Sequence, residues 1–138
     1  MAGSLSAEEV VRVAEFRGAL RRFLRTTERN AQAAGLTPQR YLLLLMIKGA
    51  PDLSEQSTVT ELADRLQLAQ STVTELVSRA EESGLVERRR SSADGRIAHL
   101  SLSAEGERRF AQAFTNNESE RSALLRAFEH LEASPLTV

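Results

Sequence analysis

The sequence predicts a mainly α-helical fold that carries one small β-hairpin. Two observations lead to this fold class. Over most of the 138 residues, apolar side chains recur at spacings of three and four, which is typical of amphipathic helices. Alternating polar and apolar residues, typical of strands, are concentrated in two short segments between residues 85 and 102. We therefore expect a series of helices, then a hairpin, then a final helical segment.

Composition limits the classes of function. Hydrophobic residues make up 41% of the chain and charged residues 27%, which is ordinary for a globular protein. The absence of cysteine excludes disulfides, thiolate zinc sites and thiol redox switches. The N-terminus lacks the pattern of a signal peptide, and the longest apolar run, "YLLLLMI", is too short to span a membrane. We expect a single domain, residues 1–138, that is cytoplasmic, separate from membranes and without a metal or cofactor.

The first helix is expected over residues 6–34. Ser6 and Glu9 match a capping box, and the next proline is Pro38. A helix of this length exceeds the usual 11 to 12 residues, so its apolar face could pack on its own domain or on another chain. That face comprises Val10, Val13, Phe16, Leu20, Phe23 and Leu24.

A lobe with its own core is expected over residues 37–102. It begins with a helix capped by Thr37, which starts at Pro38 and ends near Gly49. This helix is apolar almost all round, which predicts that it forms the buried centre of the lobe.

Two further helices follow with a short turn between them. "TELADRL" is expected to start with Thr60 as its N-cap, and "QLAQ" is the turn. The second helix, "STVTELVSRAEESG", places apolar residues at helical spacing and ends at Gly84. Its inward residues are Val73, Leu76, Val77 and Ala80. Such a pair forms a helix-turn-helix unit, whose second helix enters the major groove of DNA.

The segments "LVERRR" and "RIAHLSL" have strand character, and "SSADG" connects them. In the second strand Ala98, Leu100 and Leu102 are expected to point inward. A helix-turn-helix unit followed directly by a hairpin is a winged helix, in which the hairpin is the wing.

The last helical segment begins after Ser103, which is a good N-cap. The polar stretch "TNNESE" allows one long helix or two helices broken near Asn117, and we expect one helix over residues 103–133. Long amphipathic helices at both ends, residues 6–34 and 103–133, favour a homodimer. The apolar residues of this last segment are Phe110, Ala113, Phe114, Leu124, Leu125, Phe128 and Leu131.

Taken together, these elements resemble the MarR (multiple antibiotic resistance regulator) family of winged-helix transcriptional regulators, roughly over residues 10–131. The stretches that carry the resemblance are "ELADRLQLAQSTVTELVSRAEESGLVERR" and "ADGRIAHLSLSAEG". The resemblance implies a homodimer with interlocking terminal helices, which binds a pseudo-palindromic operator in double-stranded DNA, most often as a repressor. It also implies release from DNA by a small aromatic effector bound between the dimer helices and the DNA lobe, among Phe, Leu and Tyr41 side chains.

Three departures from the family pattern bear on the site. Gln67 replaces a frequent glycine in the turn and is expected to adopt an uncommon backbone conformation. Ala69 replaces a capping residue, a role that Gln70 or Ser71 is expected to take. Glu75 stands where a basic residue is frequent and could accept from a cytosine amino group or pair with Arg79. Little sequence follows residue 133, so the family's short sixth helix is expected to be missing or reduced.

The candidate contacts to DNA lie on the second helix of the helix-turn-helix unit. Its exposed polar residues can donate to and accept from base edges and phosphates, although an ordinary solvated helix face would look similar. Arg79 could reach a phosphate or pair with Glu75 or Glu82. The polar set is Gln70, Ser71, Thr72, Thr74 and Ser78.

The wing supplies the remaining contacts. Arg96 is expected to enter the minor groove, held in direction by the carboxylate of Asp94. Arg88 and Arg90 are expected to contact phosphates, with Arg89 on the other face of the strand. The family resemblance favours this role for Arg96 over that of a surface ion pair.

Two other classes of function compete with a DNA-binding regulator. The only histidines, His99 and His130, belong to no catalytic or metal-binding motif, so we expect a protein that is not an enzyme. A winged helix that binds another protein is the stronger alternative, because residues 65–100 hold six basic and five acidic residues, a net charge of only +1. Two wings projecting from one face of a dimer would still concentrate positive charge by geometry.

Overall fold

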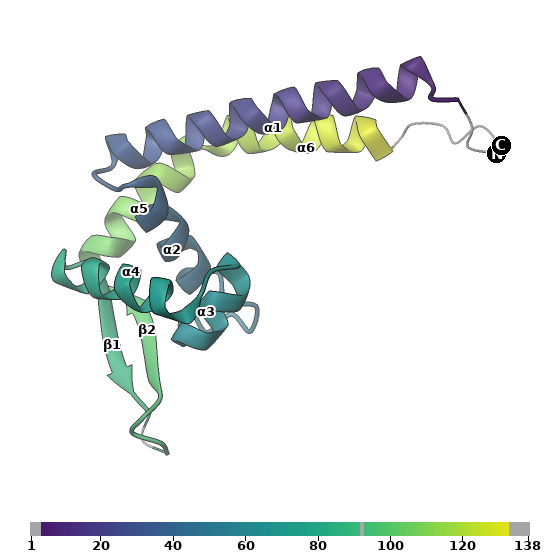
Figure 1. Ribbon diagram of the computed structural model, residues 1–138. Helices are drawn as coiled ribbons and strands as arrows, with labels where there is room; N and C mark the ends of the chain where they lie inside the picture. Colours follow the sequence, from purple (N-terminus) through teal and green to yellow (C-terminus); the bar gives the residue numbers. More distant parts are fainter. Residues whose placement is uncertain (1–3, 92, 133–138) are drawn as a thin grey trace.

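A computed structural model describes residues 4–91 and 93–132 of the chain (Figure 1). The mainly helical fold with one small hairpin agrees with the prediction. The elements are α1 (Ala7–Ala33), α2 (Pro38–Lys48), α3 (Val59–Leu66), α4 (Gln70–Glu82), β1 (Val86–Arg90), β2 (Ala98–Leu102), α5 (Ala104–Asn116) and α6 (Glu118–Glu132).

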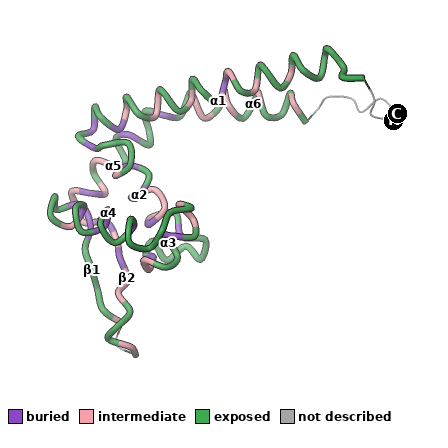
Figure 2. The backbone as a smooth tube through the Cα atoms, viewed as in Figure 1, coloured by how far each residue is buried: buried purple, intermediate pink, exposed green. Residues whose placement is uncertain are grey.

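The hydrophobic core lies in a lobe built from α2, α3, α4, the hairpin and α5. As predicted, α2 is its centre, and Leu43, Leu44 and Ile47 are fully buried. The prediction holds for one side of the helix only, since Leu42 is 42% exposed. Figure 2 shows that buried residues are concentrated in the lobe and at the end of α1 that lies next to the lobe. The lobe therefore has a core of its own.

The hairpin projects from the lobe as a wing (Figure 1). Its strands are antiparallel, with Arg88 opposite Leu100 and Arg90 opposite Ala98. Directly opposed residues point to the same face of a sheet. Both arginines therefore lie on the face that carries the buried Leu100, whereas Arg89 lies on the other face.

An arm made of α1 and α6 extends away from the lobe (Figure 1). The two helices run side by side in opposite directions, and the rings of Phe16 and Phe128 pack with their centroids 6.1 Å apart. Every described position of α6 is exposed or half-buried. The arm therefore leaves apolar surface uncovered in the single chain.

The expectation of one helix over residues 103–133 is wrong. The chain forms α5 up to Asn116 and α6 from Glu118, and Asn117 stands between them with 1% exposure. A sixth helix is therefore present, contrary to expectation. The break arises because the Asn117 side chain bonds to two other helices, which sequence periodicity does not report. Residue 133 lies outside the described residues.

Two of the expected caps are also wrong. Thr58, not Thr60, caps α3, because its hydroxyl accepts from the Glu61 amide while the Glu61 carboxylate accepts from the Thr58 amide. At the start of α4 the N-cap is Ala69, whose methyl group accepts nothing, so neither Gln70 nor Ser71 takes over capping. The unusual backbone of Gln67 is confirmed by its φ of 56°.

Candidate nucleic-acid interface

The helix α4 has the two faces that the sequence predicts. Val73, Val77 and Ala80 are fully buried, and they fix the helix against the lobe core. The face opposite them therefore points to solvent. All of the predicted polar contacts on this helix are exposed: Gln70, Ser71, Thr72, Thr74, Ser78 and Arg79.

The first turn of α4 is favourable to an anion. Because Ala69 provides no side-chain acceptor, the amides of this turn are not capped by the protein, and the turn carries no acidic residue. Free amides and the positive end of the helix dipole attract phosphate groups. The Gln70 side chain is oriented by its donation to the Thr60 hydroxyl over 3.4 Å.

Arg79 and Glu75 form an ion pair on the exposed surface of α4. The guanidinium Nη2 lies 2.6 Å from the Glu75 carboxylate, one helical turn away. The pair is one of the alternatives that the sequence left open for both residues, and their contact with DNA stays a prediction. Both side chains are more than 60% exposed, so the pair contributes little to stability and neither side chain is locked in place.

The wing tip holds Arg96 in the predicted arrangement. The Asp94 carboxylate accepts from the Arg96 backbone amide over 3.0 Å and from its Nε over 3.3 Å. The Arg96 side chain is nevertheless 92% exposed, so its remaining donors are open to a ligand. Asp94 thus fixes the base of the side chain and leaves its end available.

Arg88 and Arg90, the two strand arginines expected to contact phosphates, are bonded within the protein when no DNA is present, and their contact with phosphates stays a prediction. The Glu81 carboxylate on α4 accepts from Arg88 over 2.7 Å and 3.3 Å, and this bonding raises the pKa of Arg88. Arg90 donates to the Gly95 carbonyl over 2.8 Å. Arg88 therefore joins the wing to α4. The contact is possible because Arg88 lies on the same face of the hairpin as the buried Leu100, and this face packs on the lobe.

A cavity of about 240 Å³ lies where the arm meets the lobe, a region in which the family resemblance implied Phe and Leu side chains together with Tyr41. Burial raises the pKa of the Tyr41 phenol, so the hydroxyl stays neutral at ordinary pH. Sequence reasoning missed Asn117 and Arg121, and the polar stretch "TNNESE" was the available signal. The walls are formed by Phe23, Leu24, Thr27, Glu28, Pro38, Tyr41, Leu42, Leu45, Phe114, Asn117 and Arg121.

Across residues 4–91 and 93–132, no group of three or more metal-binding side chains comes together. Within the same ranges, no helix combines the length and hydrophobicity needed to cross a membrane.

The exposed face of α4, the preceding α3 and the adjacent wing define a winged helix-turn-helix protein. Residues 34–97 match the family model described as "MarR family". Two regulators of Bacillus subtilis (strain 168) are similar in sequence. One is the uncharacterized HTH-type transcriptional regulator YsmB, 31% identical over 60% of this chain and 54% of its own length. The other is the HTH-type transcriptional repressor MdtR, 28% identical over 65% of this chain and 56% of its own length.

The match thus spans about half the length of these two relatives. Among solved structures, a mutant of MarR from E. coli complexed with operator DNA aligns with 96% of this chain and all of its own, with a TM-score of 0.67 and 18% identity. The resemblance to the MarR family is therefore confirmed, by sequence over residues 34–97 and by fold over most of the chain.

Proposed function

We propose that the protein is a transcriptional regulator that binds double-stranded DNA, with α4 in the major groove and Arg96 in the minor groove. The observation that carries the proposal is the wing tip, where an arginine 92% exposed is aimed by Asp94. The Arg88–Glu81 ion pair makes α4 and the wing one unit, so both can engage one DNA site together. Such a regulator acts in the cytoplasm, where bacterial operators are found, and the description of MdtR supports repression.

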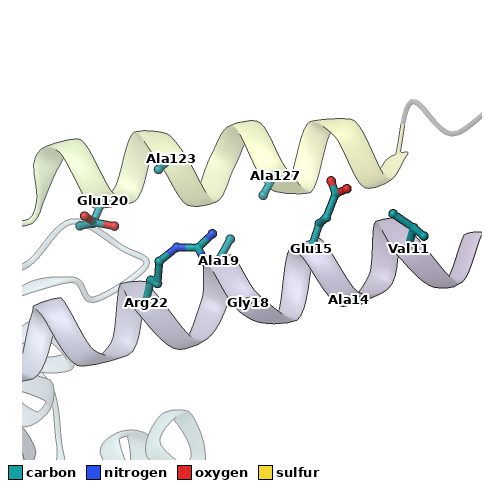
Figure 3. Close-up of a pocket in the computed structure, with 9 residues that line it drawn as sticks. All are labelled: Val11, Ala14, Glu15, Gly18, Ala19, Arg22, Glu120, Ala123 and Ala127. Atoms are coloured by element: carbon teal, nitrogen blue, oxygen red, sulfur yellow. The ribbon is translucent and has the colours of Figure 1, made fainter. Parts of the chain in front are cut away.

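The regulator binds as a homodimer through the arm. Small residues of α1 and α6 leave a groove of about 530 Å³ between the helices, into which a partner helix can pack closely (Figure 3). Elsewhere on α1 and α6, as well as in the groove, large apolar side chains are 42 to 56% exposed in the single chain. These are Val10, Val11, Val13, Leu24, Leu125 and Phe128.

Charge supports the same arrangement. Helix α1 holds six arginines and four glutamates, whereas α6 holds four glutamates and two arginines. The two helices therefore have opposite net charge, which favours contact between α1 of one protomer and α6 of its partner. A two-fold dimer presents two recognition helices and two wings to a pseudo-palindromic site.

The cavity at the junction of arm and lobe is the site for a small aromatic effector. Its apolar walls include Phe23 and Phe114, and Arg121 supplies a cation at its edge. A ligand of this kind would stack on the rings and pair with the guanidinium. Its binding there would alter the contact between arm and lobe and thereby DNA affinity.

Mobility shift of DNA from around the protein's own gene, at low and moderate salt, tests the proposal. The expected result is a saturable shift that weakens as salt rises, with a half-site pattern in the protected sequence. Arg126→Ala serves as a matched control for wing variants, because Arg126 is an exposed arginine on the arm. Absence of any shift at every salt concentration would favour the alternative, a winged helix that binds another protein.

A further inference from the structure

The break between α5 and α6 is built around one buried amide. Asn117 is 1% exposed, although the residues on either side of it are exposed. Its backbone stays near helical values, with φ of −88° and ψ of 0°, so the chain bends there instead of turning back. The bend lies where the arm leaves the lobe (Figure 1).

The Asn117 side chain joins three helices. Its Oδ1 accepts from the Nδ2 of Asn30, in the last turn of α1, over 2.7 Å. Its Nδ2 donates to the hydroxyl of Tyr41, in the first turn of α2, over 3.3 Å. One amide therefore connects the arm helix α1, the lobe helix α2 and the link between α5 and α6.

The carbonyl groups that the bend releases from helical bonding are also paired. The Phe114 carbonyl accepts from the Nη1 of Arg121 over 2.7 Å, and the Asn116 carbonyl accepts from the Nδ2 of Asn30 over 3.1 Å. The Arg121 guanidinium also lies 4.0 Å from the centre of the Phe114 ring. The buried Asn117 amide and two carbonyls at the bend thus have side-chain partners, which favours one angle, because another angle would leave the Asn117 amide unpaired.

We infer that Asn117 is a positioning residue for DNA binding: it sets the angle between arm and lobe, and thereby the separation of the two recognition helices and the half-site spacing that the dimer prefers. This inference rests on the proposed function, because spacing matters only for a dimer on DNA. Fully buried core side chains such as Leu62, Val73 and Leu100 lie on α3, α4 and β2, to which the Asn117 side chain does not bond, so we expect loss of the Asn117 amide to affect the angle before it affects the lobe.

The size of the effect follows from the length of the arm. Fifteen residues of α6 extend about 22 Å at 1.5 Å per residue. A change of about 10° at Asn117 moves the far end of that helix by about 4 Å relative to the lobe. This displacement is close to the 3.4 Å rise of one base pair, so a small change in angle alters the spacing by about one step.

Spin-label distances test the angle without requiring DNA. The chain has no cysteine, so Glu82→Cys on α4 and Arg126→Cys on α6 give one label on the lobe and one on the arm. Labelled protein is diluted into unlabelled protein so that distances within one protomer dominate. We expect a narrow distribution for the otherwise unchanged chain and a broadened or shifted one for Asn117→Ala. Asn116→Ala, an exposed neighbour, is the matched control and should leave the distribution narrow.

Operator spacing tests the consequence. Binding is measured at fixed salt on sites whose half-sites are moved apart or together by one base pair. The unchanged protein should prefer one spacing by at least about tenfold, and Asn117→Ala should reduce this preference to about threefold or less, with affinity for a single half-site unchanged.

The outcomes separate the inference from the proposed function. If the unchanged protein binds no DNA, the proposed function fails, and so does the spacing role. If it binds as a dimer while Asn117→Ala keeps both the narrow distance distribution and the spacing preference, only the inference is overturned. Should Asn117→Ala fail to fold, Tyr41→Phe removes the acceptor hydroxyl alone, and unchanged distances and spacing in that variant overturn the inference.

Discussion

At the scale of single residues, the three wing arginines expected to contact DNA differ: Arg96 is open to a ligand, whereas Arg88 and Arg90 are bonded within the protein. Arg96 keeps most of its donors free, whereas Arg88 is bonded to Glu81 and Arg90 to a wing carbonyl. The total positive charge of the wing therefore overstates what DNA can use. For DNA binding, the position of the Arg96 guanidinium at the wing tip matters more than the net charge of the chain, which is −1.

Arg96→Ala should weaken operator binding by about 1 to 3 kcal/mol, because it removes the group expected in the minor groove. The melting temperature should stay near that of the unchanged protein, since the side chain is 92% exposed. Fluorescence anisotropy with a labelled operator measures the effect, and Arg126→Ala should bind normally. Full affinity in a correctly folded Arg96→Ala variant would refute the role of the wing.

Arg88 leads to a prediction about salt. Because Glu81 already neutralises this guanidinium, Arg88→Ala should reduce the salt slope by less than the roughly 0.9 expected for a free phosphate contact. Glu81→Gln should steepen the slope, since it releases Arg88 to the DNA. Both slopes are obtained from affinity measured over a range of salt concentrations. A full unit lost in Arg88→Ala would mean that the ion pair opens on DNA.

Acid stability involves Glu105, whose carboxylate accepts from Arg108 and Arg109. These bonds, Arg108 first, lower the pKa of Glu105 from 4.5 to about 2. Because the pKa of Glu105 is lower in the folded state, its ionised carboxylate stabilises the fold at pH values above the pKa of the unfolded state. This contribution is lost as pH falls from about 4.5 toward 2. Thermal melting of Glu105→Gln should show a small loss at pH 7 that disappears near pH 2. A deficit that persists near pH 2 would contradict the assignment.

Local pairs could be predicted from sequence, whereas pairs between elements could not. Asp94 and Arg96 are two residues apart in a turn, so their contact needs no knowledge of the fold. The Glu81–Arg88 pair depends on how β1 leaves α4. The Glu81–Arg88 pair can be predicted only when the position of the wing relative to α4 is known.

At the scale of elements, the order and type of helices and strands could be read from periodicity, but some ends could not. Thr58 and Thr60 are both good caps, and only the reciprocal bond with Glu61 decides between them. Asn117 breaks the last helix because of partners in α1 and α2, far away in sequence. A period of 3.6 residues continues across such a bend without a visible change.

Helix α4 offers a test of capping. Ala69→Ser places a hydroxyl at the N-cap and should raise the free energy of unfolding by about 0.5 to 2 kcal/mol. The same hydroxyl would compete with phosphate for the first-turn amides, so DNA affinity should not rise with stability. Urea denaturation and anisotropy measure the two quantities. Ala93→Ser, at an exposed position of the wing, is the control and should change stability little.

At the scale of the whole molecule, the long terminal helices and their apolar faces predict that the chain needs a partner. The arm leaves Leu125 and Phe128 at 56% and 42% exposure, which is costly for a protein that remains monomeric. The groove between α1 and α6 could not be foreseen from sequence, because it depends on the pairing of Gly18 and Ala19 with Ala123 and Ala127. Its shape follows from which small residues face each other.

Ala127→Arg tests the dimer through this groove. Ala127 lines the groove, and a long charged side chain there would block a partner helix and bury an unpaired charge. We expect the dimer dissociation constant to rise by at least about 30-fold, measured by sedimentation, with the circular dichroism of the lobe preserved. Ser122→Arg adds the same charge at an exposed position of α6 and is the matched control.

Because two linked lobes bind a palindrome far more tightly than one, Ala127→Arg should also lose affinity for the full operator while keeping its affinity for a half-site. A variant that stays dimeric at micromolar concentration would place the interface elsewhere on the arm.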